Sequence, residues 1–351
     1  MIVEIQYLRA IAALMVVFYH TVPQLERMGY TGPKMHFLSS GVDIFFVISG
    51  FIMTYIVTRT PQTPLAFLWN RMVRILPLYW GLTLFMVVVG ILAPSLLQSS
   101  IVQGYHLFAS LFFIPAYHPV NGEIYPLLTP GWTLNYEMFF YVIFSLCLLL
   151  PAAMRNFAAI ALISILTVGF RYFASGLLSE FYGNPIVFDF CGGIVLGWAY
   201  CAGYFRFADK RKGRLAGALA VAVGFAALVF FGLAVSGGYH LVKVGIPSFL
   251  VVLGALAVAA NRGACRLAIL ERIGDASYSL YLSHFIMMSL LGQVARKLIW
   301  RGVDAPAWSY PLFSIAAVAI CVIVSLSLHD IFEVNTQRFL RGRRSAGKVR
   351  A

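Results

Sequence analysis

The chain has 351 residues, of which 61% are hydrophobic and 11% are charged, and its net charge is +13. Soluble domains carry about 25% charged residues, so this composition excludes an ordinary soluble protein and indicates an integral membrane protein. The basic excess is explained by loops between apolar runs, and we expect no nucleic-acid partner.

The first feature along the chain is a series of apolar runs that approach the roughly 20 residues needed by a membrane-spanning helix. Ten such runs lie at 5–22, 40–58, 75–93, 132–150, 156–175, 185–204, 214–235, 243–260, 275–296 and 309–330. A shorter run at 105–116 ends in proline, which predicts an interfacial or re-entrant segment. The fold class is therefore an all-α polytopic membrane protein with about ten transmembrane helices.

The distribution of the 26 Lys and Arg residues predicts the orientation of these helices. Basic residues are retained on the cytoplasmic side of short loops, and they fall mostly on one side if the N-terminus is inside. Both termini are then cytoplasmic. We expect one transmembrane domain over 1–335, followed by a basic cytoplasmic tail at 336–351. The GxxxG spacings at Gly193/Gly197 and Gly213/Gly217 fit either helix contacts or chance.

The first apolar run carries an arginine and a histidine near its two ends. Arg9 and His20 are eleven residues apart, which closes three helical turns within roughly 20° and separates the residues by about 16 Å. They therefore share one face of the predicted helix, with His20 toward the outer side. Either residue alone would be interpreted as a helix-end residue, because such positions let polar side chains reach water.

The next two motifs add an acid and an arginine pair. "GVDIFFVISGF" begins the second run and puts Asp43 at the level of His20, where a solvated helix-end acid is the simpler interpretation. "WNRMVRILP" puts Arg71 and Arg74 on one helical face at the cytoplasmic entry of the third run. Guanidinium groups match phosphate geometry, so this pair suits a phosphate-bearing ligand, although it also suits a topology determinant.

Two later motifs place polar groups inside apolar runs. "GWTLNYEMFFY" brings Glu137 several residues into the fourth run, where a carboxylate needs a partner such as an arginine or a wet cavity. "GDASYSLYLSH" at 274–284 supplies two tyrosines and His284, a position at which packing is the commoner role of histidine. The seven histidines form no close ligand set, so we expect no metal.

Taken in order, these motifs resemble the membrane-bound acyltransferase-3 family, and most closely its bacterial exopolysaccharide acetyltransferase branch. The resemblance implies a ten-helix bacterial inner-membrane enzyme that moves an acyl group, usually acetyl from acetyl-coenzyme A, onto a sugar hydroxyl of a surface polysaccharide or its lipid-linked precursor. It also implies that Arg9, His20, Arg71 and Arg74 are required. The expected partners are therefore acyl-coenzyme A, the glycan acceptor and the bilayer, with polysaccharide assembly proteins as further candidates and no tightly bound cofactor.

The resulting hypothesis assigns a role to each polar residue. His20 is the candidate base, because its ordinary pKa allows it to accept a proton at neutral pH. Its ring would be oriented by Asp43 or Glu137, and the sequence does not decide between them. The remaining roles are charge stabilisation at the thioester by Arg9, phosphate binding by Arg71 and Arg74, and a sugar-binding wall of Trp132, Tyr136 and Tyr141.

Three alternatives stay open at this point. The acyl group could pass directly or through a covalent acyl-histidine. A saccharide or lipid-linked saccharide transporter could use His20, Asp43 and Glu137 as a proton relay. The protein could also be a non-catalytic scaffold in a polysaccharide assembly complex. Acylation by reconstituted protein that depends on His20 would separate the enzyme from the other two.

Overall fold

The computed structural model describes residues 2–94, 101–234, 239–261, 266–301 and 303–340. Within these ranges the chain is helical, and its only β-type pairing is an isolated bridge between Tyr117 and Ile124. The chain divides into two compact units. The first consists of Met1–Tyr19, Lys34–Pro64 and Tyr136–Asp275; the second consists of His20–Pro33, Leu65–Asn135 and Ala276–Ala351.

The predicted all-α membrane class is confirmed, and each predicted apolar run coincides with a helix. Seven helices within the described residues are long and apolar enough to cross a membrane: Val3–Glu26, His36–Arg59, Pro64–Leu92, Ala152–Phe173, Lys210–Leu233, Leu241–Asn261 and Ser309–Leu340. The predicted total of about ten spans and the cytoplasmic position of both termini stay predictions. The 105–116 segment contains a helix of eight residues, too short to span.

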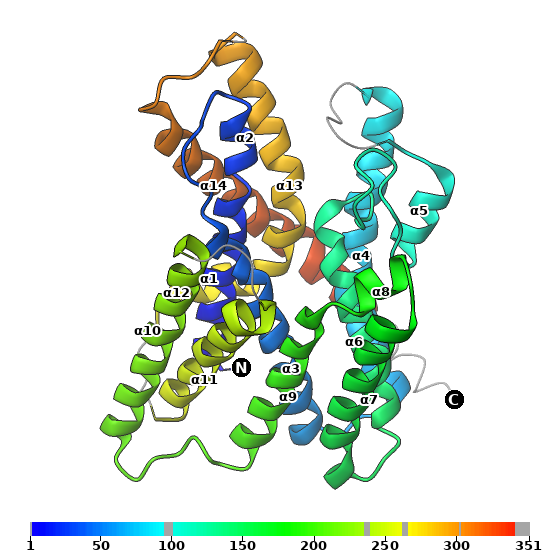
Figure 1. The fold of residues 1–351 in the computed structure, drawn as a ribbon, viewed down its shortest axis with the longest axis vertical. Coiled ribbons are helices and arrows are strands. Elements are labelled where there is room, and N and C mark those ends of the chain that lie inside the picture. The colour runs from blue at the N-terminus through cyan, green and yellow to red at the C-terminus, as the bar shows by residue number, and fades with distance from the viewer. Residues whose placement is uncertain (1, 95–100, 235–238, 262–265, 302, 341–351) are drawn as a thin grey trace. The chain divides into compact units, whose positions relative to one another are not determined.

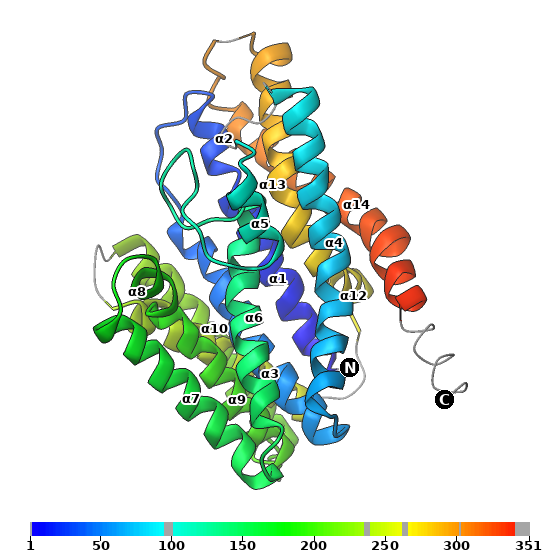
Figure 2. The ribbon, with the colours of Figure 1, turned by 90° about the vertical axis from the view of Figure 1, so that its right-hand side faces the viewer.

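The first unit contains most of the helices (Figures 1 and 2). They are α1 (Val3–Tyr19), α3 (Gly41–Arg59), α6 (Trp132–Cys147, from Tyr136 onward), α7 (Ala152–Phe173), α8 (Leu177–Tyr182), α9 (Phe188–Cys201), α10 (Lys210–Ala234), α11 (Ile246–Asn261) and α12 (Ala268–Asp275). Short 3-10 helices His36–Ser40 and Pro185–Val187 precede α3 and α9, and a π-helical turn, Leu241–Gly245, precedes α11.

Glycines set the closest helix pairs of this unit. A Cβ on Gly193 of α9 would meet backbone atoms of Val47, Phe51 and Gly50 in α3, and a Cβ on Gly217 of α10 would meet the Gly254 carbonyl in α11. The backbones can approach this closely only because no side chain intervenes. The GxxxG spacings are therefore helix contacts rather than chance.

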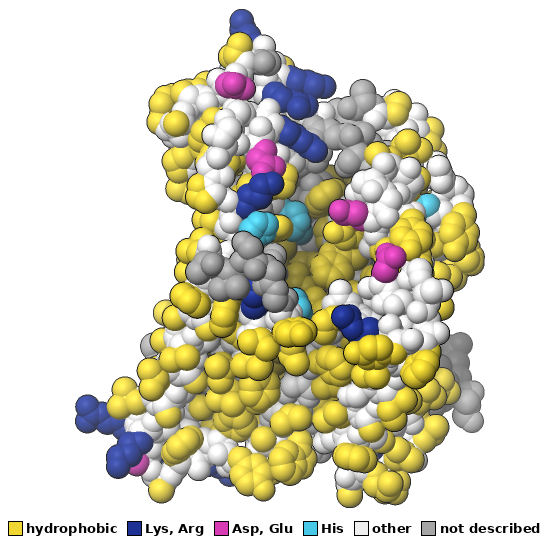
Figure 3. All heavy atoms as spheres, in the orientation of Figure 1, with side chains coloured by type: hydrophobic (Ala, Val, Ile, Leu, Met, Phe, Trp, Pro, Cys, Tyr) yellow, Lys and Arg dark blue, Asp and Glu magenta, His cyan; other side chains and the backbone are white. Residues whose placement is uncertain are grey.

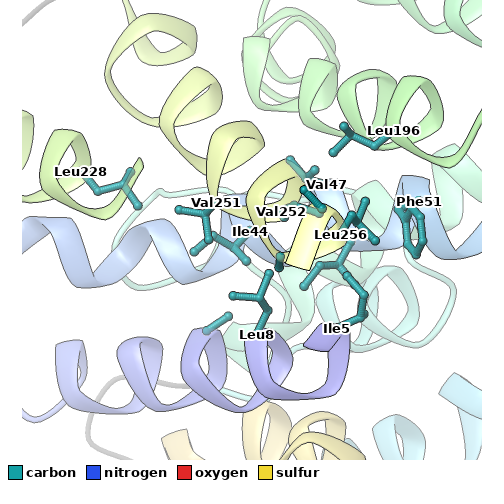
Figure 4. Packing of buried hydrophobic residues seen from close by; sticks show 14 of the residues in the cluster. Ile5, Leu8, Ile44, Val47, Phe51, Leu196, Leu228, Val251, Val252 and Leu256 are labelled. Carbon is teal, nitrogen blue, oxygen red and sulfur yellow. The ribbon is translucent and has the colours of Figure 1, made fainter. Parts of the chain in front are cut away.

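The core of the first unit lies between α1, α3, α9, α10 and α11 (Figure 4). Its fully buried members include Ile44 and Val47 from α3 and Val252 and Leu256 from α11. The surface of α7, α9 and α10 is also largely hydrophobic (Figure 3), with exposed side chains such as Ile165 and Leu219. Apolar groups on both the inside and the outside of helices are the pattern of a protein whose solvent is lipid.

The second unit is built around three long helices. Its elements are α2 (Val22–Glu26), α4 (Pro64–Leu92), α5 (Gly104–Leu111), the 3-10 helix Thr129–Gly131, the start of α6, α13 (Ser277–Val294) with the π-helical turn Ala295–Ile299, and α14 (Ser309–Leu328) with the π-helical turn His329–Glu333. The Tyr278 hydroxyl of α13 donates to the Ile75 carbonyl of α4 at 2.7 Å. The Tyr79 hydroxyl and the Trp80 indole N–H of α4 donate to the Ser110 and Leu111 carbonyls at the end of α5, both at 2.9 Å.

The predicted domain boundary at 335/336 falls within a helix, because the segment after the last π-helical turn stays helical to Leu340. The rest of the predicted basic tail, residues 341–351, lies outside the described residues. The single transmembrane domain stays a prediction beside the two compact units.

Candidate functional site

Arg9 is buried in α1 and is held within the first unit by a chain of hydrogen bonds. Its guanidinium Nη1 donates to Gln6 Oε1 at 2.7 Å, and the Gln6 amide donates to the Asp275 carboxylate at the end of α12. Only 6% of Arg9 is exposed. The charge predicted near the cytoplasmic end of the first span is therefore fixed by a second helix, which differs from a side chain reaching for solvent.

The sequence of α12 explains why Asp275 can reach Gln6. Gly274 lies against the backbone carbonyl of Gln6, and a Cβ at this position would overlap that oxygen. The glycine therefore lets α12 pack directly on α1, and the next residue supplies the carboxylate. Gly274 and Asp275, the first two residues of the "GDASYSLYLSH" motif, therefore hold Gln6, which in turn holds Arg9.

Asp43 lies in the first turn of α3 and contacts two other side chains of the first unit. Its Oδ1 is 2.7 Å from Nε2 of His240, which precedes α11, and the carboxylate of Asp189 in the first turn of α9 lies close to both. Burial lowers the pKa of His240, but the hydrogen bond and the charge of Asp43 outweigh it, so that this pKa is raised. Asp43, Asp189 and His240 each offer a ligand atom, and these atoms lie within 4.8 Å of one another.

Glu137 of α6 is hydrogen-bonded to two hydroxyl groups. Ser49 of α3 donates to Oε1 at 2.8 Å, and Tyr141, one helical turn along α6, donates to Oε2 at 2.6 Å. The two carboxylate oxygens therefore each accept a hydrogen bond from a different hydroxyl group. These two hydroxyls fill the role for which the sequence suggested an arginine or a wet cavity.

The three aromatic residues predicted to bind sugar differ in burial. Tyr136 is 2% exposed, its ring is stacked on Phe181 with a centroid distance of 4.0 Å, and its hydroxyl donates to the Phe181 carbonyl at 2.8 Å. Tyr141 is also buried, with its hydroxyl on Glu137. Trp132, the first residue of α6, belongs to the second unit and is partly exposed. Trp132 is thus the most accessible of the three.

His20 lies in the turn between α1 and α2, at the start of the second unit, and is partly exposed. Its ring meets the ring of His284 edge to face, with centroids 4.8 Å apart and an interplanar angle of 66°. Since α1 ends at Tyr19, the shared helical face of Arg9 and His20 crosses from one unit to the other and stays a prediction.

His284 is fully buried in α13, and its tautomer is fixed by the backbone. Nδ1 lies 2.6 Å from the Tyr281 carbonyl, which can only accept, so Nδ1 carries the hydrogen. Nε2 then has a lone pair, and it has no hydrogen-bond partner among the described residues. His284 thus places a buried imidazole, with its hydrogen on Nδ1, beside the ring of His20.

The two arginines of α4 have different surroundings. Arg71 is buried, with its guanidinium carbon 5.9 Å from the centre of the Phe67 ring. Arg74 is partly exposed, and its charge is close enough to attract the carboxylate of Glu333. Because the two residues are three positions apart on one helix, they present two positive charges on adjacent turns.

Glu333 organises a polar cluster that the sequence did not indicate. The carboxylate accepts from Ser279 Oγ at 2.7 Å, from His329 Nδ1 at 3.0 Å and from the Gln337 amide at 3.2 Å. It lies beyond the predicted end of the last span. Glu333 and Arg74 are far apart in the sequence, so no local motif could predict that they interact.

Comparison with known proteins assigns the chain to a family. The acyltransferase domain model of the acyltransferase-3 family matches residues 2–329. The chain is 35% identical to the exopolysaccharide production protein ExoZ of Rhizobium meliloti over 315 residues, covering 90% of this chain and 94% of that protein. It is 24% identical to the acyltransferase MdmB of Streptomyces mycarofaciens over 337 residues, covering 87% of this chain and 82% of that protein. No solved structure matches.

Proposed function

The chain belongs to the acyltransferase-3 family, and we propose that it transfers an acetyl group from acetyl-coenzyme A to a hydroxyl of an exopolysaccharide or its lipid-linked precursor. The acceptor class is supported by the similarity to a protein of exopolysaccharide production. A multi-pass protein of the bacterial inner membrane would meet the donor at its cytoplasmic side. The observation that carries the chemistry is the pair of His20 and His284.

His20 is the general base of this reaction. The imidazole takes the proton of the acceptor hydroxyl while the oxygen attacks the thioester carbonyl, so that a C–O bond forms. The C–S bond then breaks, and His20 returns the proton to the coenzyme A thiolate. The products are an O-acetylated sugar and free coenzyme A, and no other reactant is needed.

His284 positions His20 in this scheme. Its Nδ1–H is held by the Tyr281 carbonyl, so the ring cannot rotate without losing that bond. The neutral ring lies against the edge or face of His20 and presents a lone pair rather than a second positive charge. The imidazolium that forms when His20 takes the proton is therefore not opposed by its neighbour.

Arg71 and Arg74 are the donor-binding residues of the proposal. Guanidinium groups form charge-assisted hydrogen bonds to phosphate oxygens, and coenzyme A carries several phosphates. The attraction of Glu333 to Arg74 supports a defined position for the second guanidinium before the donor binds. The roles predicted for Arg9, Asp43 and Glu137 stay predictions from the sequence.

The test is acetyl transfer by purified protein in lipid vesicles, with labelled acetyl-coenzyme A and crude polysaccharide precursor. Label should reach the glycan with the wild type and with His36→Ala, which removes an exposed histidine, but not with His20→Ala. Transport of the precursor without acylation would favour the transporter instead. A ping-pong kinetic pattern would replace direct transfer by an acyl-histidine intermediate.

A further inference from the structure

The cluster of Asp43, Asp189 and His240 lies at one end of the first unit's core helices. Asp43 and Asp189 occupy the first turns of α3 and α9, and His240 precedes the π-helical turn before α11. Both carboxylates are almost fully buried, at 4% and 3% exposure, whereas the His240 side chain is 31% exposed. Side chains from three different elements thus place three potential metal ligands close together.

The two carboxylates require a compensating positive charge. Two buried carboxylates this close repel each other, so their charge must be offset by a shared proton, by a protonated His240 or by a bound cation. The buried Oδ2 of Asp189 has no hydrogen-bond partner among the described residues, so it is also available to a cation. A cation can coordinate this oxygen, because its ligands surround it in three dimensions.

The donor atoms indicate the kind of cation. One imidazole nitrogen and two carboxylate oxygens are typical ligands of zinc and related divalent transition metals, whereas calcium and magnesium prefer oxygen alone. The partly exposed His240 provides the path by which an ion could enter and by which water could complete its coordination.

We propose that Asp43, Asp189 and His240 form a binding site for a divalent transition metal of the zinc class, which fastens α3 and α9 to the start of α11. Because each ligand comes from a different element of the first unit, the bound ion would hold these elements together. It does not depend on the proposed acyl transfer.

The experiment uses the full chain purified in detergent with a tag that contains no histidine. The protein is treated with a chelator, exchanged into metal-free buffer, titrated with ZnCl2 and separated from excess metal. We expect about one zinc ion per chain by elemental analysis, together with a higher unfolding temperature, because the ion binds the folded state. MgCl2 at the same concentration should give neither result.

Asp189→Asn and His240→Gln should each lose the bound zinc and the temperature shift. The matched controls are Glu180→Gln and His36→Gln, which remove an exposed acid and an exposed histidine of the same unit; both should retain zinc. Wild-type protein that binds no zinc would overturn the proposal and leave a shared proton or a protonated His240 as the compensating charge. Zinc retained equally by all variants would also overturn it, because binding would then be adventitious.

A spectroscopic measurement on the wild type covers the case in which the two ligand variants fail to fold. Cobalt(II) should occupy the same site and give visible d–d absorption of a low-symmetry nitrogen and oxygen environment, which added zinc should abolish. Absence of such bands in folded wild-type protein, or bands that zinc does not displace, would contradict the site.

Discussion

Arg9 and Asp43 in the first unit are held by a different kind of contact from His20 and Arg71 in the second. In the first unit Arg9 is bonded to Gln6, and Asp43 to His240, through charged or strongly polar atoms. In the second unit His20 lies against the ring of His284, and the guanidinium of Arg71 lies over Phe67. A hydrogen bond to a carboxylate stabilises one charge state, whereas a ring contact orients an imidazole without requiring that it be charged. The ring contact of His20 is therefore better suited to a residue that must gain and lose a proton.

The largest effect expected from this comparison is on catalysis at His20. His20→Ala should lower acetyl transfer by about 10²–10⁴-fold, the usual contribution of a general base. The unfolding temperature should change little, because His20 lies in a turn and is partly exposed. The measurement is the rate of label transfer in vesicles beside a thermal melt in detergent.

His284→Ala and His284→Asn test whether His284 positions the ring of His20 for catalysis. Both should lower the rate, and the asparagine should retain part of it if a polar side chain at 284 is enough to orient His20. The pH at which the rate is half-maximal should also move, which a purely structural role would not produce. An unchanged pH profile at reduced stability would assign His284 to packing alone.

The next effect concerns the donor. Arg74→Ala should raise the apparent KM for acetyl-coenzyme A by about 10–100-fold, because a charge-assisted hydrogen bond contributes about 1.5–3 kcal/mol. The KM of Arg74→Lys should lie between those of Arg74→Ala and the wild type. Lysine keeps the positive charge but lacks the two parallel N–H donors of the guanidinium group. Arg59→Ala, which removes an exposed arginine at the end of α3, is the matched control and should leave KM unchanged.

The sequence predicted the helices well and their polar contacts poorly. A long run of apolar residues indicates a helix that faces lipid or the protein core, and every predicted span coincides with a helix. The partners of Asp43 were not predictable, because Asp189 and His240 follow on separate helices whose neighbours depend on the fold. Glu137 illustrates the same limit: Tyr141 is a local helical neighbour visible in the sequence, but Ser49 comes from α3.

The packing of α12 on α1, which holds Arg9 in place, can be tested by a substitution at Gly274. Gly274→Ala should destabilise the chain by about 1–3 kcal/mol, because the new methyl group would overlap the Gln6 carbonyl and force α12 away from α1. Gly169→Ala in α7 is the matched control, since nothing lies within 4 Å of its added Cβ. Alanine favours a helix over glycine by about 0.8–1 kcal/mol, so the control should be neutral or stabilising.

Unfolding in detergent monitored by circular dichroism would measure both variants. Equal stability of Gly274→Ala and Gly169→Ala would show that α12 adapts easily, and the hydrogen-bonded support of Arg9 would then be weaker than the structure indicates.

A smaller effect tests whether Tyr141 supports Glu137 or a substrate. Tyr141→Phe should cost about 1 kcal/mol of stability, because one hydroxyl donor to the Glu137 carboxylate is lost. Tyr172→Phe, at an exposed position of α7, is the control and should be neutral. A variant of full stability and reduced acetyl transfer would instead assign Tyr141 to the predicted sugar-binding wall.

The smallest effect belongs to the second unit, in the segment after α5. Burial, followed by the nearby His106, lowers the pKa of His118 from its ordinary value of 6.5, with the charge of Glu123 opposing the shift. The unfolded chain therefore binds a proton at His118 more readily than the folded one. Stability is fully present above the ordinary pKa and falls as the pH drops from there toward the lowered value. Between about pH 7.5 and about pH 5.5, the loss of thermal stability should be smaller in His118→Gln than in the wild type. His36→Gln should retain the wild-type loss, and a His118→Gln profile that matches the wild type would mean that this histidine charges freely in the folded protein.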